Sequence, residues 1–224
     1  MVLVDTVYQR VLALANKEQR GYITPQEFNL FANQAQLEIL DSYIYEIKFF
    51  SRTPGNDKEY SDMSNLLEEK LGVFKTSIST SAGANIALPV NLYKLGSIFS
   101  NNLLLEQVNV NELHELRRSP LTTPSATNPV CVFTDNLITT HPGGLGSIDI
   151  TYIRKPHEVK WGYVVINDKA LYDPGKTTNF ELHTSEETEL VYKILKLSGA
   201  AIQKPDIAQF AQGMEQGLQQ QEKQ

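Results

Sequence analysis

The apolar residues of this chain change their spacing twice, and no other sequence feature limits the fold as much. They recur at three- and four-residue intervals up to about residue 72, alternate with other residues over 73–179, and return to helical intervals over 180–224. Helical spacing buries one face of a helix, whereas alternation buries one face of a strand. The sequence therefore predicts an α+β fold with an N-terminal helical pair, a β-rich antiparallel middle and C-terminal helices.

The N-terminal region, residues 1–72, reads as two helices followed by a shorter one. The first helix begins near Asp5, and a short third helix is expected over 63–71. The second begins at a capping box, in which Thr24 is the N-cap and Glu27 occupies the third helical position. Its apolar stripe continues to about Phe50, where aromatic residues nearly encircle the last turns. Such an end is expected to need a partner on most sides.

The middle region, residues 73–179, is expected to form an antiparallel sheet or a small sandwich. Asn and Asp tolerate the positive φ angles of tight hairpins, and pairs of them stand between several apolar runs, as at Asn167-Asp168. A short helix is expected over 111–118, followed by an exposed proline-bearing loop over 119–129. The expected strands are 74–79, 86–88, 93–99, 103–108, 130–133, 137–140, 148–153, 159–166 and 170–172.

The last region, residues 180–224, returns to helix and is expected to form one folding unit with the N-terminal helices. Thr184 and Glu187 suggest a second capping box. A terminal helix over 206–222 carries one narrow apolar line, which is too little surface for a stable isolated helix. We expect this helix to dock onto its own domain or another chain, or else to fray.

Composition excludes several classes of protein. The net charge is -6 and no segment is strongly basic, which argues against a dedicated DNA or RNA reader, because such proteins neutralise phosphates with Lys and Arg. The single cysteine, Cys131, can form neither an internal disulfide nor a cysteine-based zinc site. No membrane span or secretory signal is visible, so we expect a protein made in a reducing cytosol.

One local match suggests a calcium loop over residues 16–27, with Gly21 at its sixth position and Glu27 at its twelfth. Its fifth position is Arg20, a cation where calcium needs an oxygen ligand. A helix stop at Gly21 and the capping box explain the same residues without a metal. We therefore expect no bound metal, with a calcium-binding interaction module as an alternative.

The remaining chemical motifs favour structural roles. The glycine-rich run 142–146 precedes a strand, so it is read as a turn and not as a phosphate loop. The four histidines are dispersed, and Cys131 is expected to be a buried, inert thiol. No pattern organises a nucleophile, so the sequence predicts a protein that is not an enzyme and has no cofactor. A virion-associated hydrolase with an unrecognised site remains the alternative.

Four segments together resemble virion structural proteins of tailed phages, in particular those of crAss-like and other phages that infect Bacteroidetes. The order of helices, β-rich middle and closing helices is also similar to that of head-to-tail connector or tail adaptor ring proteins. The segments are VDTVY with LANKEQRGYITPQEFN in residues 4–29, LPVNLYKL in 88–95, ITYIRKP in 150–156 and FELHTSEETEL in 180–190.

The resemblance implies a non-enzymatic adaptor in the neck or tail of the virion, made in the host cytoplasm. Such subunits form a homo-oligomeric ring, here expected to be a dodecamer. The ring contacts the portal protein and adjacent tail rings, and double-stranded DNA passes through it during genome ejection without sequence-specific binding. No active-site residue is implied.

A ring subunit needs two different faces with which to meet its neighbours. The sequence offers three candidate contact regions: the aromatic end of the second helix, the loop 119–129 and the terminal helix. The candidate interface residues are Phe49, Phe50, Pro120, Pro124, Ile207, Phe210, Met214 and Leu218.

Overall fold

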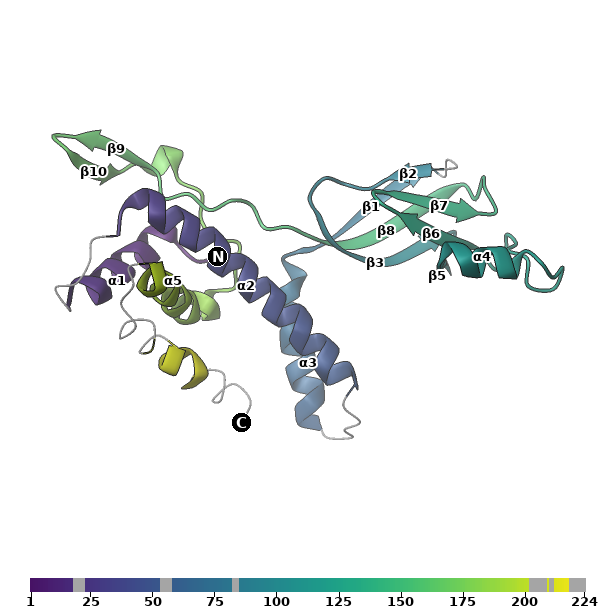
Figure 1. Ribbon diagram of the computed structural model, residues 1–224, viewed down its shortest axis with the longest axis horizontal. Helices are drawn as coiled ribbons and strands as arrows, with labels where there is room; N and C mark the ends of the chain where they lie inside the picture. The colour runs from purple at the N-terminus through teal and green to yellow at the C-terminus, as the bar shows by residue number, and fades with distance from the viewer. Residues whose placement is uncertain (18–22, 53–57, 82–84, 202–208, 210–211, 218–224) are drawn as a thin grey trace. The chain divides into compact units, whose positions relative to one another are not determined.

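The chain folds into two compact units in the computed structural model, which describes residues 1–17, 23–52, 58–81, 85–201, 209 and 212–217. The helical unit comprises Met1–Val73 with Pro156–Gln224, and the β unit comprises Phe74–Lys155. Figure 1 labels the helices and strands of each unit. The predicted α+β class, with helices at both ends and antiparallel sheets in the middle, is confirmed.

The helical unit is organised around the long helix α2. This helix lies against both α3 and α5, and α5 also lies against α1. The predicted capping box opens α2: Thr24 N donates to Glu27 Oε2 at 2.9 Å, and Glu27 N donates to Thr24 Oγ1 at 3.3 Å. The helices are α1 (Val4–Lys17), α2 (Pro25–Arg52), α3 (Lys58–Gly72) and α5 (Glu187–Ala201).

The apolar stripes predicted for these helices form the core of the helical unit. Each fully buried Val, Leu, Ile or Phe side chain stabilises the fold by about 1.5–3 kcal/mol. Phe180 and Leu182, just before α5, complete this core. The largest fully buried side chains of the unit are Phe28, Phe180, Ile23, Ile39, Leu40, Leu182, Leu190 and Ile194.

An extended segment, residues 157–161, is held along α2 by side-chain amides. It directly precedes a β-hairpin formed by residues 163–172. Asn33 brackets Val159, since its Oδ1 accepts from Val159 N at 2.7 Å and its Nδ2 donates to Val159 O at 2.9 Å. Asn29 Oδ1 accepts from Trp161 N at 2.7 Å, and Gln36 Nε2 donates to His157 O at 3.0 Å. Positions 29, 33 and 36 are one turn apart, so one helix face supplies all three amides.

This attachment corrects two predictions. The expected domain boundary at residue 179 is misplaced, because residues 156–179 belong to the helical unit. The expected strand 159–166 is shorter, since only Tyr163–Ile166 is a strand, β9. Residues 159–161 are extended, but their backbone groups bond to α2 and to Thr178 instead of a strand ladder.

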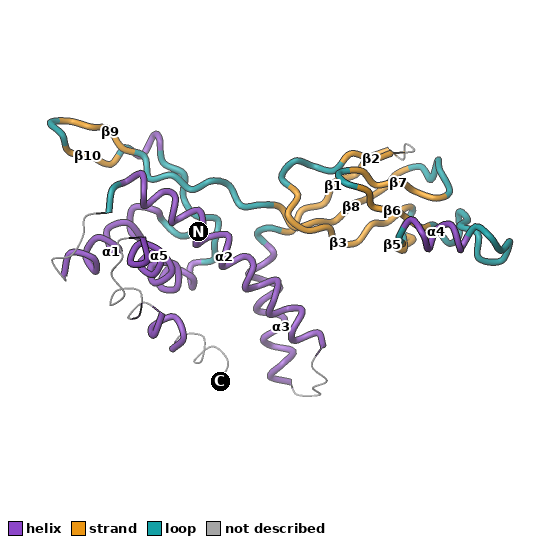
Figure 2. The backbone as a smooth tube through the Cα atoms, in the orientation of Figure 1, coloured by secondary structure: helices purple, strands orange, loops and turns teal. Residues whose placement is uncertain are grey.

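Strand β9 pairs with β10 (Lys169–Tyr172) in a hairpin, drawn as strands of the helical unit in Figure 2. The two residues between the strands are Asn167, with φ of 50°, and Asp168, with φ of 59°. Positive φ at both positions fits a type I′ turn, the connection whose twist suits a two-residue hairpin. The predicted turn is confirmed.

The β unit is a small sandwich of two four-stranded sheets, ordered β1-β8-β3-β4 and β2-β7-β6-β5. Both sheets contribute to one apolar core, which includes Ile98, Cys131, Ile138 and Ile150. Pairing is antiparallel except between β5 and β6, which are parallel. The strands are β1 (Lys75–Ser81), β2 (Asn85–Ala87), β3 (Leu92–Ser100), β4 (Leu103–Leu104), β5 (Glu106–Val108), β6 (Val130–Thr134), β7 (Leu137–His141) and β8 (Ser147–Arg154).

Other element boundaries differ modestly from expectation. The predicted strand 103–108 is divided between β4 and β5, because Leu105 turns into the core. Helix α4 (Val110–Leu116) replaces the expected 111–118, and α3 begins at Lys58 instead of residue 63.

The predicted capping box at Thr184 is wrong. Thr184–Glu186 form a 3-10 turn, whose N-cap is His183, with Nδ1 accepting from Ser185 N at 3.3 Å. Helix α5 starts after that turn, at Glu187. Glu186, the last residue of this turn, is buried and paired with Lys70.

Candidate interaction surfaces

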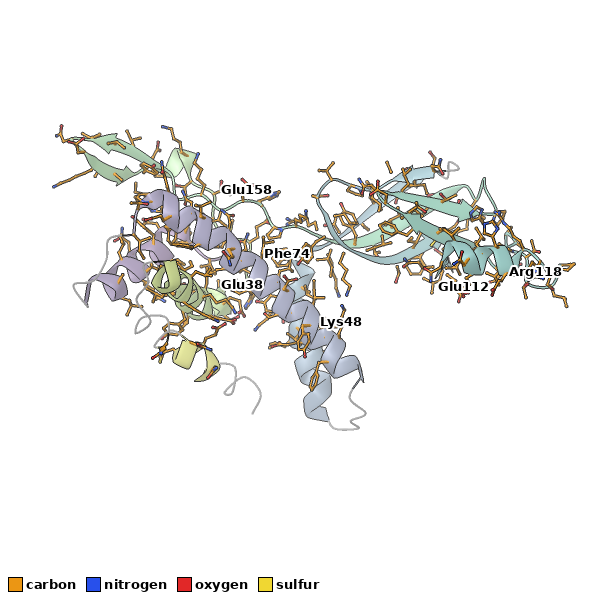
Figure 3. All side chains as sticks on the ribbon, viewed as in Figure 1. Glu38, Lys48, Phe74, Glu112, Arg118 and Glu158 are labelled. Carbon is orange, nitrogen blue, oxygen red and sulfur yellow. The ribbon has the colours of Figure 1, made fainter. Side chains whose placement is uncertain are left out.

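The β9–β10 hairpin exposes apolar side chains on both of its faces. Alternate residues and directly paired residues share a face, so Val164, Ile166 and Leu171 lie together. Their exposed fractions are 39%, 53% and 50%, and Val165, on the opposite face, is 60% exposed. Side chains stand out along this hairpin in Figure 3. Among the described strands, β9 and β10 pair only with each other, so both outer edges are open to a further strand.

Trp161 anchors the hairpin rigidly to the helices. Its side chain is buried, and its Nε1 donates to Asp5 Oδ1 at 2.9 Å. Its ring lies 4.4 Å from the ring of Tyr8 in α1, and 5.8 Å from those of Tyr163 and Tyr172 at the base of the hairpin. The hairpin is therefore ordered by its own helical unit before any partner is present.

Gly162 closes the base of the hairpin. A Cβ at this position would lie 2.6 Å from the Lys176 carbonyl carbon and 2.8 Å from the Asp173 carbonyl oxygen. Gly162 N donates to Thr177 Oγ1 at 3.1 Å, and Asp173 N donates to Gly162 O at 2.9 Å. Only a residue without a side chain allows this close backbone approach.

A second group of exposed apolar side chains lies on α2, outside the face that enters the core. We define the outer stripe of α2 as Leu30, Leu37, Tyr45 and Phe49, whose exposed fractions are 71%, 39%, 71% and 56%. At 100° per residue, Leu30 and Leu37 lie opposite Phe28 and Ile39, whereas Tyr45 and Phe49 lie on the flank between that side and the core face. Glu38 and Lys48, labelled in Figure 3, lie among them on the same part of the helix. The outer stripe is therefore a mixed surface, in which exposed apolar side chains alternate with charged ones.

The structure accounts for some of the sequence-predicted contact residues. Phe49 belongs to the outer stripe, while the side chain of Phe50 lies outside the described part of the chain. Pro120 is exposed and Pro124 is half-buried in the loop 119–129. Thr123 Oγ1 bonds to the Ser119 carbonyl, so the loop is internally braced. Met214 is 40% exposed, and the three others, Ile207, Phe210 and Leu218, lie outside the described residues.

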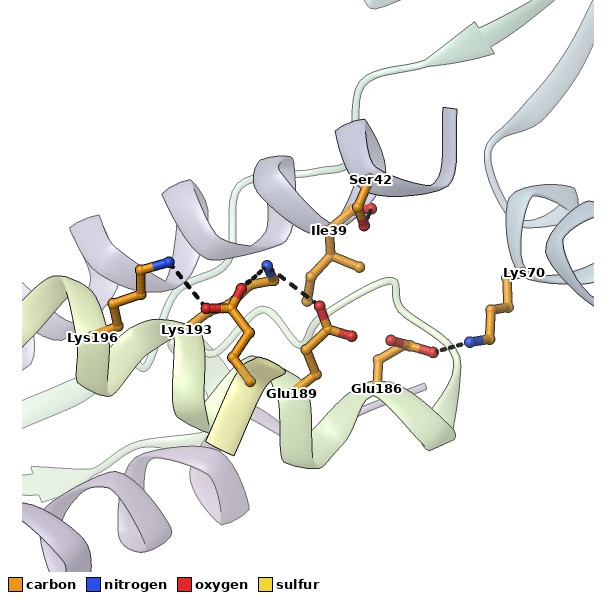
Figure 4. Close-up of polar contacts among 8 residues, drawn as sticks. Ile39, Ser42, Lys70, Glu186, Glu189, Lys193 and Lys196 are labelled. Atoms are coloured by element: carbon orange, nitrogen blue, oxygen red, sulfur yellow. Dashed lines mark hydrogen bonds and ion pairs between the residues drawn. The ribbon is translucent and has the colours of Figure 1, made fainter. Parts of the chain in front are cut away.

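The described turn 212–217 of the terminal helix docks on α5 through a partly buried ionic network (Figure 4). Lys193 Nζ lies 2.6 Å from Glu215 Oε1 and 3.3 Å from Glu189 Oε1, and Lys196 Nζ lies 3.0 Å from Glu215 Oε2. A further buried pair joins Lys70 of α3 to Glu186 at 2.7 Å. Residues 212–217 thus dock onto their own domain, while most of the predicted terminal helix, 206–222, lies outside the described residues.

Burial separates the pKa values of the carboxyl groups in this network. Burial raises the pKa of Glu189 to about 7, with added repulsion from Glu186, and nearby Lys193 only partly offsets this. Burial would also raise the pKa of Glu186, but the hydrogen bond and charge of Lys70 lower it below its ordinary value. Glu215 likewise has a lowered pKa, because its bonds to Lys193 and Lys196 outweigh its burial. The network is suited to joining elements rather than to moving protons onto a ligand.

The described residues bring together no group of three or more His, Cys, Asp or Glu side chains able to hold a metal ion. His157 Nε2 lies 3.7 Å from Glu181 Oε1, but the imidazole is 67% exposed, so this pair does not lie in a buried site. Burial raises the pKa of the Cys131 thiol to about 11, so the predicted inert thiol is confirmed. The glycine run 142–146 is a turn with positive φ at Gly144 and Gly146, as predicted.

Much of the calcium-like loop 16–27 lies outside the described residues. At its end, the Glu27 carboxylate bonds to the backbone N and the hydroxyl of Thr24. These bonds lower the pKa of Glu27 and use this carboxylate as a helix cap. Across the described ranges, no helix is both long enough and apolar enough to cross a membrane.

No protein-family model matches this sequence, and no curated protein matches it significantly. The hairpin was not among the contact regions predicted from the sequence, although its Val165, Ile166 and Leu171 are at least half exposed. The sequence did contain one sign of this exposure. The run Tyr163–Ile166 and the facing run 170–172 are apolar at every position, and a hairpin of this size cannot bury both of its faces by itself.

Proposed function

We propose that the protein is a structural adaptor subunit of a tailed phage, forming a homo-oligomeric ring that joins the portal of the head to the tail. The observation that carries this proposal is the pair of apolar surfaces on one helical unit. The hairpin is held rigidly by Trp161, yet its Val165, Ile166 and Leu171 are at least half exposed. Exposed apolar patches on an ordered scaffold mark protein contact sites.

The two surfaces differ from one another, which suits a ring. A head-to-tail interface joins two different patches of the same subunit, and it closes when the rotation between neighbours divides a full turn. The outer stripe of α2 and the hairpin are two such patches. The sequence resemblance to adaptor ring proteins supports the same assignment.

Charge supports the second part of the proposal, passage of DNA. Each subunit has a net charge of -6, and a ring multiplies this charge around its axis. An acidic wall repels phosphates and lets DNA slide without retention. We expect the assembled protein to retain no double-stranded DNA at low salt, where attraction to a basic wall would be strongest.

The test is to measure the mass of the purified full chain, alone and mixed with the portal protein of the same phage. Mass photometry should detect a closed oligomer in the mixture, and electron microscopy should show it as a ring stacked on the portal. A chain that stays monomeric and ignores the portal would contradict the proposal. Calorimetric titration with millimolar calcium separates the calcium-module alternative, which requires measurable heat.

A further inference from the structure

We propose that the β9–β10 hairpin of one subunit packs on the outer stripe of α2 of a second copy of this chain. This inference names the partner of the hairpin, and it rests on the proposed ring function. The contact would bury Val164, Ile166 and Leu171 of one copy against Leu37, Tyr45 and Phe49 of the next.

Geometry excludes contact of the hairpin with Tyr45 and Phe49 of its own copy. The hairpin is anchored beside Asn29 of α2 through Trp161. Phe49 lies twenty positions further along the helix, about 30 Å away at 1.5 Å per residue. Strand β9 has only four residues, so it extends about 13 Å at roughly 3.3 Å per residue. The hairpin therefore cannot cover the far end of its own α2.

Charge complementarity favours a second copy as the occupant. The hairpin and its base, residues 159–178, carry three lysines and two aspartates, of which Lys169 stands on the same face as Ile166. Between Leu30 and Phe49, the outer part of helix α2 carries two acidic residues, Glu38 and Asp41, and one lysine, Lys48. Asp41 falls between Leu37 and Tyr45 on the outer side of the helix. A weakly basic apolar arm thus matches a weakly acidic apolar stripe.

The arm also fits by its preformed shape. Trp161 and Gly162 hold the hairpin before contact, so little ordering free energy is lost on binding. Aromatic side chains at Tyr45 and Phe49 offer large contact areas, and aromatic residues are enriched in the parts of interfaces that contribute most. One hairpin and one stripe per subunit give a head-to-tail chain of contacts that a ring can close.

The decisive experiment uses cysteine pairs and a short bismaleimide cross-linker on the full chain, alone and bound to portal. Cys131 is buried with a raised thiol pKa, so it can be retained. The double variant Leu171→Cys with Tyr45→Cys should give a ladder of covalent oligomers. Each single variant should give none by itself, whereas mixing the two should give cross-linked dimers.

Other outcomes overturn the inference in distinct ways. Cross-linked dimers from Leu171→Cys alone would mean that two hairpins meet face to face. Absence of cross-links in an assembly that still forms on the portal would contradict the inference and leave the proposed function standing. A cross-linked oligomer that never binds portal would support the inference and contradict the proposed function. A chain that stays monomeric with and without portal would contradict both.

Polar substitutions supply an independent measurement. Ile166→Ser with Leu171→Ser should raise the concentration needed for oligomerisation at least tenfold, while the melting temperature stays unchanged because both side chains are exposed. The matched control is Val90→Ser with Leu121→Ser, at positions 96% and 97% exposed in the β unit. An equal effect from the control pair, or none from the hairpin pair, would overturn the inference.

Discussion

Trp161 Nε1 donates a 2.9 Å hydrogen bond to Asp5 Oδ1, joining the base of the hairpin to the first turn of α1 across 156 positions of sequence. Asp5 is also well placed for the N-terminal end of the α1 dipole. The Asp5 carboxylate therefore stabilises the start of α1 and orients the Trp161 indole, against which the base of the hairpin packs. This bond links α1 to a hairpin whose apolar side chains are partly exposed.

Replacing Asp5 by alanine should lower the free energy of unfolding by about 1–2 kcal/mol, because a buried indole N–H loses its charged acceptor. Urea denaturation followed by circular dichroism and tryptophan fluorescence measures this loss. Trp161 is the chain's single tryptophan, so fluorescence reports the same site. Asp168→Asn, which keeps a residue tolerant of positive φ at the hairpin tip, is the control and should change stability little.

Replacing Asn33 by alanine should cost about 2–3 kcal/mol, since both backbone groups of Val159 would lose their partner in a part-buried site. Gln34→Ala is the matched control, because Gln34 is exposed on the same helix and its side chain donates to Glu38, within α2. Denaturation midpoints of the two variants provide the comparison. Equal midpoints would mean that the extended segment is not held by this amide.

Replacing Gly162 by alanine should destabilise the hairpin base by more than 2 kcal/mol, of the order found for overpacked sites. The new Cβ would meet backbone atoms at 2.6–2.8 Å, which cannot move aside as a flexible side chain could. Gly143→Ala is the control, because nothing lies within 4 Å of its Cβ position. Proteolysis near residues 162–177 should accelerate in the first variant alone.

The ionic network predicts a pH dependence of stability. The pKa of Glu189 is raised to about 7 in the folded state, above its ordinary value of 4.5. The folded state therefore binds this proton more tightly. Its stabilising contribution is complete below pH 4.5 and is lost as the pH rises through 7.

Glu186 and Glu215 have lowered pKa values and act in the opposite sense, so their contributions are lost as the pH falls below about 4.5. Between pH 8 and pH 5, Glu189 should dominate and add about 2–3 kcal/mol. Glu189→Gln should remove this dependence and be the more stable protein at pH 8. Thermal melts at several pH values test it, and an unchanged slope in the variant would contradict the assignment to Glu189.

Local patterns in the sequence predicted much of the secondary structure. The capping box at Thr24, the apolar stripe through Val7 and Val11, and the hairpin turn at Asn167-Asp168 depend on neighbouring residues alone. The prediction of a second capping box at Thr184 failed, because this segment forms a 3-10 turn with His183 as its N-cap. Its last residue, Glu186, forms a buried ion pair with Lys70, more than a hundred positions away, which no local pattern indicates.

The contact surfaces required the tertiary structure. An apolar run such as Tyr163–Ile166 has the same pattern whether it is buried or exposed, so exposure of Ile166 could not be predicted from spacing. An exposed apolar side chain was expected at Phe49, because aromatic residues nearly encircle the end of the helix. The exposure of Leu30 and Leu37 was not predicted, since only the packing of Phe28 and Ile39 shows which side of α2 faces outward.

By itself, then, the sequence determined the order of helices and strands, their caps and their tight turns, because these follow from interactions within a few residues. Only the tertiary structure decided that residues 156–179 belong to the helices. That assignment depends on the amides of Asn29, Asn33 and Gln36 meeting a backbone more than 120 positions away. Contacts between such distant residues follow from how the whole chain packs, and no local pattern encodes them.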